Sequence, residues 1–527
     1  MPGHSVADHS VSPPRITLPR EYNAAADLLA RNLGPAARSR TAYIDDHGRY
    51  SFADLDRTSA RIGALLNTAG LAREQRVLLC MHDSFLLPAA FLGAIRRGMV
   101  PVLVNTQLTA TDYAWMLGDS RARVAIVAAA LLPVFKPLLA TVPGFERIIV
   151  SGDTVPGHDS LEQLITQAAA ATEIAPTVAD EACFWLYSSG STGPPKGTVH
   201  VHSSLIHTAE LYARPILGIA AEDVVFSASK LFFAYGLGNG LTFPLSVGAT
   251  TILMAERATP AAVCRRLVEL RPTIFYGVPT LYAALLADPA LPPAGAVRLR
   301  RCTSAGEALP ADIGRRWARH FGVDILDGIG STEMLHVFLS NRAEDVRYGT
   351  TGKPVPGYAA RIVGDDGHEV AGGDIGELQV CGPTAASMYW NNRSTSRATF
   401  VGEWTRTGDK YRVDNDGYYV YCGRSDDMLK VGGIYVSPTE VEGALSAHPA
   451  VLEAAVVGRA DEHDLIKPAA YVVLAPGHTP SPALAAALQQ HVQTRLAHYK
   501  FPRWIEFVAE LPKTATGKIQ RFKLRQS

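Results

Sequence analysis

Cysteine is scarce in this chain, with six residues in 527 and no Cys-x-x-Cys pair. This spacing favours neither a zinc site nor a disulfide framework, so we expect reduced thiols buried in a core. A net charge is also lacking, because 50 Lys and Arg residues balance 50 Asp and Glu residues. The absence of a basic excess argues against a nucleic-acid-binding protein.

Long hydrophobic runs are absent as well. The most apolar stretches, such as Phe85–Ile95 and Val124–Phe135, are shorter than the roughly 20 residues that a membrane-spanning helix needs. The segment Met1–Arg20 is rich in Ser, Pro and His, so neither a signal peptide nor a membrane anchor is expected. We therefore expect a soluble, cytoplasmic protein without a membrane partner.

The chain has apolar sequence for large cores, with 47% hydrophobic residues and a length that exceeds one domain. Strand and helix patterns alternate through roughly the first 330 residues, as in the helical period of Ser51–Leu66 and the strand-like run Val77–Met81. This alternation predicts a layered α/β fold. From about Gly349, short strands separated by turn clusters predict a small β-rich subdomain.

The last region has the pattern of a separate α+β domain of roughly 100 residues. Ser437-Pro438-Thr439-Glu440 is a typical helix start, with a Ser cap, Pro in the first turn and Glu three residues after the cap. Apolar strands are expected at Leu452–Val457 and Ala469–Leu474. We predict two domains, residues 1–425 and residues 426–527.

The strongest motif is the segment Tyr187-Ser188-Ser189-Gly190-Ser191-Thr192-Gly193-Pro194-Pro195-Lys196-Gly197, which follows a strand-like run. Its glycines allow amide N–H groups to approach phosphate oxygens, its hydroxyls add donors, and its lysine adds a point charge. The Walker phosphate loop requires Ser or Thr and then a helix after the lysine, whereas here Gly197 and a returning strand follow. The expected phosphate contacts are Ser188, Ser189, Gly190, Ser191, Thr192, Gly193 and Lys196.

This loop resembles the phosphate loop of the adenylate-forming superfamily, which includes acyl- and aryl-CoA synthetases, peptide-synthetase adenylation domains and beetle luciferases. The segment Asp327-Gly328-Ile329-Gly330-Ser331-Thr332-Glu333 resembles the second signature of that superfamily. The resemblance implies that Thr332 holds the α-phosphate and that Glu333, with Thr192, holds Mg²⁺. A carboxylate suits this hard cation, which takes its remaining ligands from water and phosphate.

Other motifs resemble the parts of the superfamily site that hold the nucleoside. The resemblance implies adenine contacts from the Ser304–Ala308 segment and from Asp327, and ribose contacts from Asp409 of the Thr407-Gly408-Asp409 motif and from Arg424. By themselves, the Thr-Gly-Asp motif would be an ordinary turn and Arg424 a surface arginine. The residues expected on the adenine side are Gly306, Glu307, Ala308 and Asp327.

The C-terminal region resembles the mobile domain of the same superfamily. The motif Gly423–Lys430 implies a hinge at Asp426, and the motif Leu511–Arg521 implies that Lys518 is the catalytic lysine. A mobile ammonium group at this place would offset the repulsion between the acid and the α-phosphate. After domain rotation, Gly432 and Gly433 would line the tunnel for the pantetheine arm of CoA.

Two segments strongly resemble those of benzoate–CoA ligases, Lys230–Asn239 and Glu333–Asn341. In those enzymes the aryl pocket is walled by the residues that match Ala234, Tyr235, Gly330, His336 and Val337. Aromatic and apolar walls suit a benzene ring, and no acidic residue lies in Phe233–Gly238 to pair with an amino acid's amine. Plain core packing is the alternative interpretation of these side chains. Benzoate–CoA ligases usually carry Ile where this chain has Val337, which leaves room for a ring substituent.

The resemblance implies an ATP-dependent ligase that converts benzoate to benzoyl-AMP and then to benzoyl-CoA, using Mg²⁺ and coenzyme A. Three alternatives stay open at this point: a hydroxybenzoate– or aminobenzoate–CoA ligase, an adenylating enzyme that loads a carrier-protein thiol, and a nucleotide-binding protein without activity. The expected partners are small molecules: an aryl acid, ATP and CoA. The oligomeric state is left open, a homodimer included.

Overall fold

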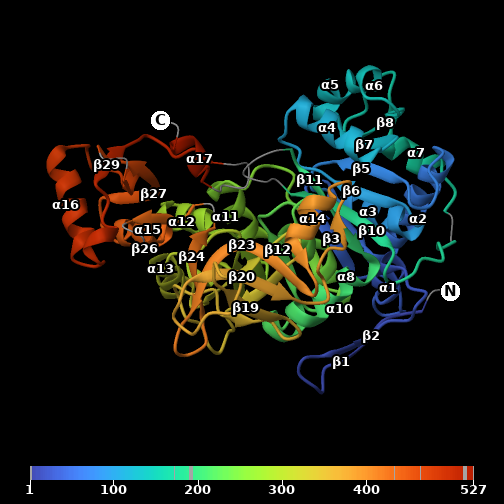
Figure 1. The fold of residues 1–527 in the computed structure, drawn as a ribbon. Coiled ribbons are helices and arrows are strands. Elements are labelled where there is room, and N and C mark those ends of the chain that lie inside the picture. The colour runs from blue at the N-terminus through green and yellow to red at the C-terminus, as the bar shows by residue number, and fades with distance from the viewer. Residues whose placement is uncertain are drawn as a thin grey trace.

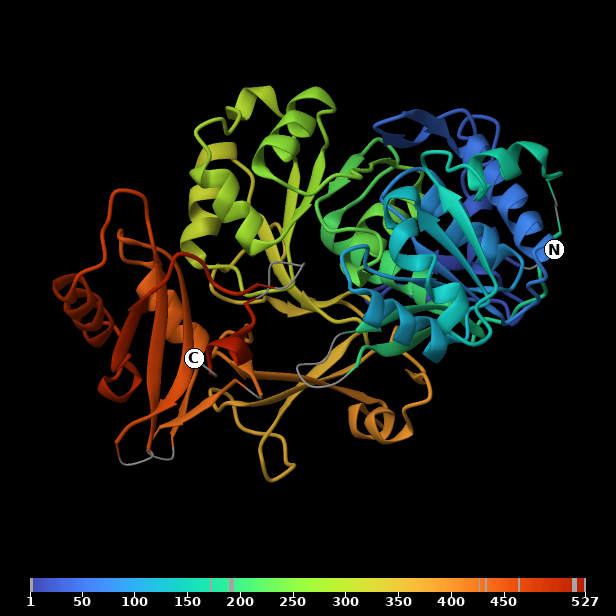
Figure 2. The same ribbon diagram turned by 90° about the horizontal axis from the view of Figure 1, so that it is seen from above.

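A computed structural model of the chain describes residues 3–170, 173–188, 194–425, 427–431, 434–462, 465–513 and 519–525. Two large sheets with helices on their faces come first, followed by a small antiparallel sheet and a final α+β region (Figure 1). Seen from above, the blue-to-teal half and the yellow-green half lie side by side, and the orange-to-red C-terminal part lies beyond the latter (Figure 2). A short N-terminal hairpin pairs β1 (Val6–Asp8) with β2 (Arg15–Thr17).

The first large sheet has eight strands, and its central strands are parallel. Its two last strands on one side, β11 and β21, run antiparallel to their neighbours. In spatial order the strands are β21 (Met388–Tyr389), β11 (Lys196–Val201), β10 (Ala182–Ser188), β6 (Val100–Leu103), β5 (Arg76–Cys80), β7 (Val124–Ala128), β8 (Arg147–Ser151) and β9 (Asp159–Ser160).

The second large sheet has nine strands, again parallel at its centre and antiparallel at both edges. In spatial order they are β18 (Lys353–Pro354), β17 (Val337–Ser340), β16 (Ile325–Gly330), β15 (Arg301–Ser304), β14 (Ile274–Gly277), β12 (Val224–Ser227), β13 (Thr250–Ile252), β3 (Thr41–Asp45) and β4 (Gly48–Ser51).

Helices connect the strands of both sheets. The α-helices up to residue 399 are α1 (Ala24–Ala30), α2 (Phe52–Thr68), α3 (Leu86–Arg96), α4 (Ala110–Ser120), α5 (Leu132–Phe135), α6 (Leu138–Thr141), α7 (Leu161–Gln167), α8 (His202–Thr208), α9 (Ala234–Leu237), α10 (Phe243–Val247), α11 (Pro260–Glu269), α12 (Pro279–Ala287), α13 (Ala311–Phe321) and α14 (Arg393–Thr399). The 3₁₀-helices are η1 (Ala129–Leu131), η4 (Ala294–Ala296) and η5 (His498–Lys500), and the π-helices are η2 (Ala209–Leu217) and η3 (Gly238–Thr242).

The two sheets share one core between them. In β5, Val77 and Leu79 belong to this shared core, whereas Leu78 and Cys80 face a second cluster beneath α4 to α6. β14 divides in the same way, because Ile274 and Tyr276 join the shared core and Phe275 packs under α11 to α13. This alternation is what period-2 side chains in two-sided sheets produce. The result is a stack of alternating helix and sheet layers, as the sequence predicts.

Local sequence explains where the helices begin. Ser51 accepts a hydrogen bond from Asp54 N at 3.1 Å, and the Asp54 carboxylate accepts one from Ser51 N at 2.9 Å, so a reciprocal capping box starts α2. The helix predicted from Ser437 is α15 (Pro438–Ser446), whose cap Ser437 accepts from Glu440 N. The helix start predicted at Ser437 is confirmed, and so is the helix predicted from the period of Ser51–Leu66.

The predicted β-rich subdomain is an antiparallel sheet of five strands. They are β19 (Ala359–Val363), β20 (Gly376–Cys381), β22 (Phe400–Val401), β23 (Trp404–Val413) and β24 (Tyr419–Arg424). This subdomain carries the motif expected to bind ribose.

The C-terminal region has its own apolar clusters, built from residues between Leu429 and Leu524. The helix α15 and the helix at Pro482–Gln493 contribute side chains to the first cluster, and the helix at Arg521–Leu524 contributes to the second. Its remaining elements are β25 (Leu429–Val431), β26 (Ile434–Val436), β27 (Val451–Ala460), β28 (Ile466–Leu474), α16 (Pro482–Gln493), β29 (Trp504–Phe507) and α17 (Arg521–Leu524). The strands and the helix predicted here are confirmed.

All six cysteines are free, and five are buried as predicted; Cys381 is partly exposed, so the prediction of a core thiol is wrong for that residue. Its side chain lies at the end of β20, where the strand meets a turn. In the described ranges, no helix combines the length and the apolar character needed to span a bilayer.

Candidate active site

The two ends of the phosphate loop lie on adjacent antiparallel strands. β10 and β11 pair with Ser188 opposite Lys196 and Tyr187 opposite Gly197. Thr198 Oγ1 also lies 3.5 Å from Ser188 Oγ. The loop is therefore closed by a hairpin, which confirms the strand that the sequence places after Lys196 and separates this loop from one that enters a helix.

Both ends of this loop are anchored by side chains that the sequence analysis did not identify. Tyr187 donates from its hydroxyl to Asp119 Oδ2 at 2.8 Å, just before the loop. Trp115 donates from its indole N–H to the carbonyl oxygen of Pro195 at 3.2 Å, just after it. Burial raises the pKa of Asp119 despite the hydrogen bond from Tyr187. Trp115 and Asp119 both come from α4, so this helix fixes the width of the loop's base.

Thr332 and Glu333 follow β16, and their main-chain carbonyls accept hydrogen bonds from other segments. The Nε2–H of His200 in β11 donates to the Thr332 carbonyl at 2.8 Å, and Ala386 N donates to the Glu333 carbonyl at 2.7 Å. Burial lowers the pKa of His200 to about 4, so this imidazole is neutral at pH 7. These bonds place the second signature beside the strand that leaves the phosphate loop.

Tyr389 joins the two signatures through its ring and its hydroxyl. The Lys196 Nζ lies 4.5 Å from the centroid of the Tyr389 ring, and the Tyr389 hydroxyl donates to Glu333 Oε1 at 2.8 Å. The residue reaches this position because β21 pairs with β11, with Tyr389 opposite Thr198. A two-residue strand leaves no periodic signal, which is why sequence reasoning did not find Tyr389.

The expected adenine-binding segment follows β15 and lies beside β16. These parallel strands place Ser304 opposite Asp327, so both segments leave the sheet at the same edge. Leu309 N donates to Asp327 Oδ2 at 3.3 Å, whereas Oδ1 is buried and has no hydrogen-bond partner among the described residues. Burial raises the pKa of Asp327 to about 8. Gly306 is exposed, Glu307 and Ala308 are half-buried, and a bend at Gly306 and Glu307 follows β15.

The expected ribose-binding residues meet across the small sheet. Asp409 in β23 is the register partner of Arg424 in β24, and Arg424 Nη1 lies 3.3 Å from Asp409 Oδ1 and 3.1 Å from the Thr407 carbonyl. Gly408 has φ +72°, and a Cβ on it would lie 2.9 Å from Arg424 Nη2. The Thr-Gly-Asp motif is therefore part of a strand rather than a turn, and the left-handed φ of Gly408 favours glycine at this position.

The five residues expected to wall the aryl pocket are brought together. Gly330 in β16 pairs with Val337 in β17, and a Cβ on Gly330 would lie 2.5 Å from the His336 carbonyl oxygen. Tyr235 follows Ala234 in the short helix α9, and the Tyr235 hydroxyl lies 2.5 Å from Thr303 Oγ1.

The His336 ring is the centre of this aromatic group. Its centroid lies 5.4 Å from that of Tyr235, 4.5 Å from that of Phe243 and 5.2 Å from that of Tyr212. Its Nε2 lies 3.3 Å from the Tyr235 carbonyl and 3.2 Å from Asn239 Oδ1, two acceptors, so this nitrogen carries the proton. Burial lowers the pKa of His336 to about 3. The ring is therefore a neutral, hydrogen-bonded wall, and Phe243 and Tyr212 are members that the sequence analysis did not name.

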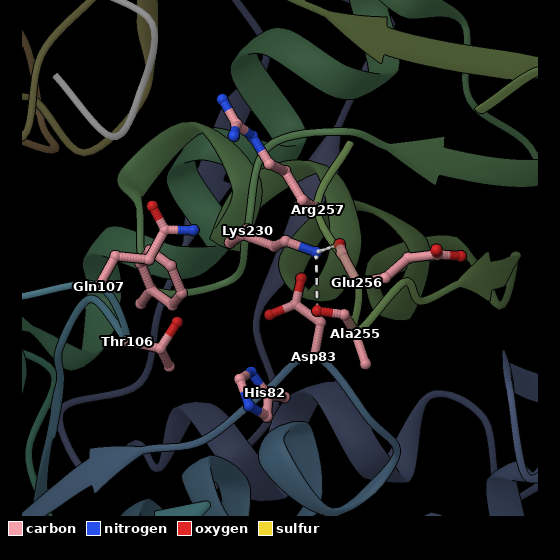
Figure 3. A pocket seen from close by; sticks show the side chains of 9 residues that line it. His82, Asp83, Thr106, Gln107, Lys230, Ala255, Glu256 and Arg257 are labelled. Atoms are coloured by element: carbon pink, nitrogen blue, oxygen red, sulfur yellow. Dashed lines mark hydrogen bonds between the residues drawn. The ribbon is translucent and has the colours of Figure 1, made fainter. Parts of the chain in front are cut away.

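A polar cavity of about 410 Å³ opens at the start of the aryl segment (Figure 3). Lys230 points across it to main-chain oxygens, with its Nζ 2.6 Å from the Glu256 carbonyl and 3.4 Å from that of Ala255. The buried Asp83 accepts from Leu231 N at 3.2 Å. Lys230 and Asp83 thus fix the position of the chain immediately before Phe232 and Phe233.

The lysine segment is anchored on both sides. Lys513 and Ile519 form an antiparallel bridge, and Gln520 N donates to the Pro512 carbonyl at 2.8 Å. The Lys513 ammonium lies 2.6 Å from Glu453 Oε1. The segment between Lys513 and Ile519 therefore begins and ends at adjacent points. Several predicted site residues lie outside the described residues: Ser189, Gly190, Ser191, Thr192, Gly193, Asp426, Gly432, Gly433 and Lys518.

The AMP-binding enzyme family matches residues 34–390, and the AMP-binding enzyme C-terminal domain matches residues 440–518. A benzoate–CoA ligase of Thauera aromatica is 63% identical over 525 residues, which cover 99% of each chain. A 4-hydroxybenzoate–CoA/benzoate–CoA ligase of Rhodopseudomonas palustris is 48% identical over 96% of this chain and 94% of its own.

Solved structures give the same result. A benzoate CoA ligase from Burkholderia xenovorans LB400 is 56% identical, with a TM-score of 0.90, over 96% of this chain and 100% of its own. An anthranilate CoA ligase in complex with anthranoyl-AMP is 44% identical, with a TM-score of 0.93, over 97% of this chain and 98% of its own.

Proposed function

Because the chain belongs to the AMP-binding enzyme family and is an AMP-forming acid–thiol ligase that joins an aryl acid to CoA, we propose that its preferred acid is benzoate. The observation that carries this proposal is the wall formed by Tyr235, His336 and Phe243 beside the second nucleotide signature. Flat apolar faces suit an unsubstituted ring. The relatives that act on benzoate and on 4-hydroxybenzoate support the same substrate class.

In the first half-reaction, a carboxylate oxygen of benzoate attacks the α-phosphorus of ATP, and the bond from that phosphorus to the β-phosphate oxygen breaks. Benzoyl-AMP and pyrophosphate result. The phosphate loop from Ser188 to Lys196 holds the triphosphate, Thr332 contacts the α-phosphate, and Asp409 with Arg424 holds the ribose. Lys518 stabilises the charge that develops between acid and phosphate, where a fixed cation is most effective.

Mg²⁺ is the metal we propose for ATP, with Glu333 as its protein carboxylate and Thr192 as a hydroxyl contact. When bound, it would neutralise charge on the phosphates. The donor set fits, because Mg²⁺ is commonly bound through one or two carboxylates plus phosphate oxygens and water. Glu333 is half-buried, and no ion pair joins it to another residue within the described ranges. Among the described residues, no group of three or more Asp, Glu, His or Cys side chains is placed to hold a metal ion.

In the second half-reaction, the CoA sulfur attacks the acyl carbon, the bond from that carbon to the phosphate oxygen breaks, and AMP leaves. The thiol proton is released to solvent. We propose that residues 426–527 rotate about Asp426, which withdraws Lys518 and brings Gly432 and Gly433 to the pantetheine arm. Small residues suit a narrow tunnel because they lack side chains that would fill it.

The deciding experiment measures AMP release with benzoate, hydroxy-, amino- and methylbenzoates, cyclohexane carboxylate and short fatty acids. It is run with free CoA and, separately, with a phosphopantetheinylated carrier protein. We expect the highest kcat/KM for benzoate and thioester product with CoA. Faster turnover of a fatty acid, or product with the carrier protein alone, would contradict the proposal.

A further inference from the structure

Tyr389 lies between two charged groups from distant parts of the chain. One face of its ring meets the Lys196 ammonium, with Nζ 4.5 Å from the centroid, and its hydroxyl donates to Glu333 Oε1 at 2.8 Å. The side chain is 3% exposed. A ring face attracts a cation, and a phenol donates to a carboxylate. The same side chain therefore stabilises both the Lys196 ammonium and the Glu333 carboxylate.

The Tyr389 ring is itself held in place. Its main-chain N–H donates to Ser396 Oγ at 3.0 Å, and its ring centroid lies 5.3 Å from that of Phe400. β21 fixes the backbone against β11. A side chain restrained on all these sides can orient the groups it contacts, because little freedom is left to either partner.

The hydroxyl is the donor in this pair, because the hydrogen bond runs from the Tyr389 phenol to Glu333 Oε1 at 2.8 Å. The phenol therefore directs its hydrogen to Oε1 and can fix the rotation of the Glu333 carboxylate.

We propose that Tyr389 is a positioning residue for the metal–ATP complex, which orients the Glu333 carboxylate toward the metal and supports Lys196 at the phosphates. This inference rests on the proposed role of Glu333 as the metal ligand. Groups that hydrogen-bond to a metal ligand set its orientation, and their loss typically costs metal affinity about 10–100-fold. A role limited to packing would instead lower stability and leave metal affinity unchanged.

The test compares four single variants of the full chain. Tyr389→Phe removes only the hydroxyl, Tyr389→Leu also removes the ring face, and Glu333→Gln removes the metal ligand's charge. The control is Tyr348→Phe, because Tyr348 also donates to a carboxylate, Asp324 Oδ1 at 2.7 Å. Asp324 precedes β16 and Glu333 follows it, so the control lies at the opposite end of the same strand.

The first measurement is Mn²⁺ binding in the presence of ATP and without acid, followed by the paramagnetic resonance signal of free Mn²⁺. We expect Tyr389→Phe to raise the Mn²⁺ dissociation constant about tenfold while metal-free ATP binding stays unchanged. Tyr389→Leu should weaken metal-free ATP binding as well, because Lys196 loses its aromatic support. The control Tyr348→Phe should convert supplied benzoyl-AMP and CoA to thioester at the rate of the unchanged chain.

The outcomes separate this inference from the proposed function. If Glu333→Gln weakens Mn²⁺ binding and Tyr389→Phe does not, the role of Tyr389 is refuted and that of Glu333 stands. If Glu333→Gln leaves Mn²⁺ binding unchanged, the metal role of Glu333 is refuted, and the inference with it. An equal loss in Tyr348→Phe would also overturn the inference, since it would reflect general loosening.

Discussion

Asp409 and Arg424 face each other on adjacent strands of the small sheet, with 3.3 Å between Oδ1 and Nη1. Their motifs stand apart in the sequence, and antiparallel register brings them together at the rim of the sheet. A carboxylate next to a guanidinium is held at a fixed orientation by a charge-assisted hydrogen bond. Asp409 is therefore suited to accept hydrogen bonds from two neighbouring ribose hydroxyls, while Arg424 holds its carboxylate in place.

We predict that Asp409→Asn raises KM for ATP by about 30-fold, because a hydrogen bond to a charged group contributes about 2 kcal/mol. The ribose is present in ATP and in benzoyl-AMP, so KM for supplied benzoyl-AMP should rise too. Steady-state kinetics of both half-reactions test this. Glu377→Gln breaks a comparable ion pair, with Arg406 in the same sheet, and should change neither constant. A selective effect on ATP alone would contradict the ribose assignment.

Lys518→Ala should lower benzoyl-AMP formation on the order of 10²–10³-fold, the cost typical of removing one charge-stabilising group. Conversion of supplied benzoyl-AMP and CoA should persist, because the rotation that we propose would withdraw the lysine before that step. The matched control is Lys513→Ala in the same segment, whose ammonium is paired with Glu453. Pyrophosphate exchange and thioester formation are the two measurements. Equal losses in both steps would refute the assigned role.

Asp426→Pro should stiffen the proposed hinge, because proline restricts φ to one narrow range. We expect pyrophosphate exchange to continue and thioester formation to fall. Asp426→Ala keeps the rotational freedom of the backbone and should retain both steps. A proline variant with an unimpaired second step would show that rotation occurs elsewhere.

Local signals were sufficient to predict most elements. The helical period of Ser51–Leu66 is α2, the strand-like run at Val77 is β5, and the cap at Ser437 starts α15. The short strands and turn clusters after Gly349 correctly predicted the small antiparallel sheet. These features depend on periodicity and capping, which a few consecutive residues determine.

Long-range pairings could not be predicted in this way. β3 and β4 come early in the chain but join the second sheet beside β13, whereas β5 to β9, which follow them, build the first. Tyr389 lies 56 residues from Glu333, to which it donates. Register across sheets is set by tertiary packing, which a single sequence does not encode locally. For the same reason, the sequence did not predict that Phe243 and Tyr212 pack against His336 in the aryl wall.

Val337 is predicted to set tolerance for ring substituents. It is buried against Gly330, and a methylene in such a wall changes discrimination by about 1–3 kcal/mol. Val337→Ile should lower kcat/KM for methylbenzoates relative to benzoate by about tenfold, and Val337→Ala should raise that ratio. Val355→Ile, at another buried valine of the same core, controls for overpacking. An unchanged ratio in both Val337 variants would place the ring elsewhere.

His336 is predicted to make stability depend on pH in a definite direction. Burial lowers its pKa from the ordinary 6.5 to about 3, so below pH 6.5 the unfolded chain takes up a proton that the folded chain does not. The contribution of neutral His336 is complete above pH 6.5 and is lost as the pH falls toward 3. Between pH 8 and pH 5 the loss is about 2 kcal/mol. His336→Phe keeps a ring among Tyr235 and Phe243 but cannot titrate, so its urea midpoint should approach that of the unchanged chain as the pH falls. A gap of constant size at pH 8 and pH 5 would show that the pKa of His336 is the same in the folded and the unfolded chain, which would contradict a buried ring that stays neutral.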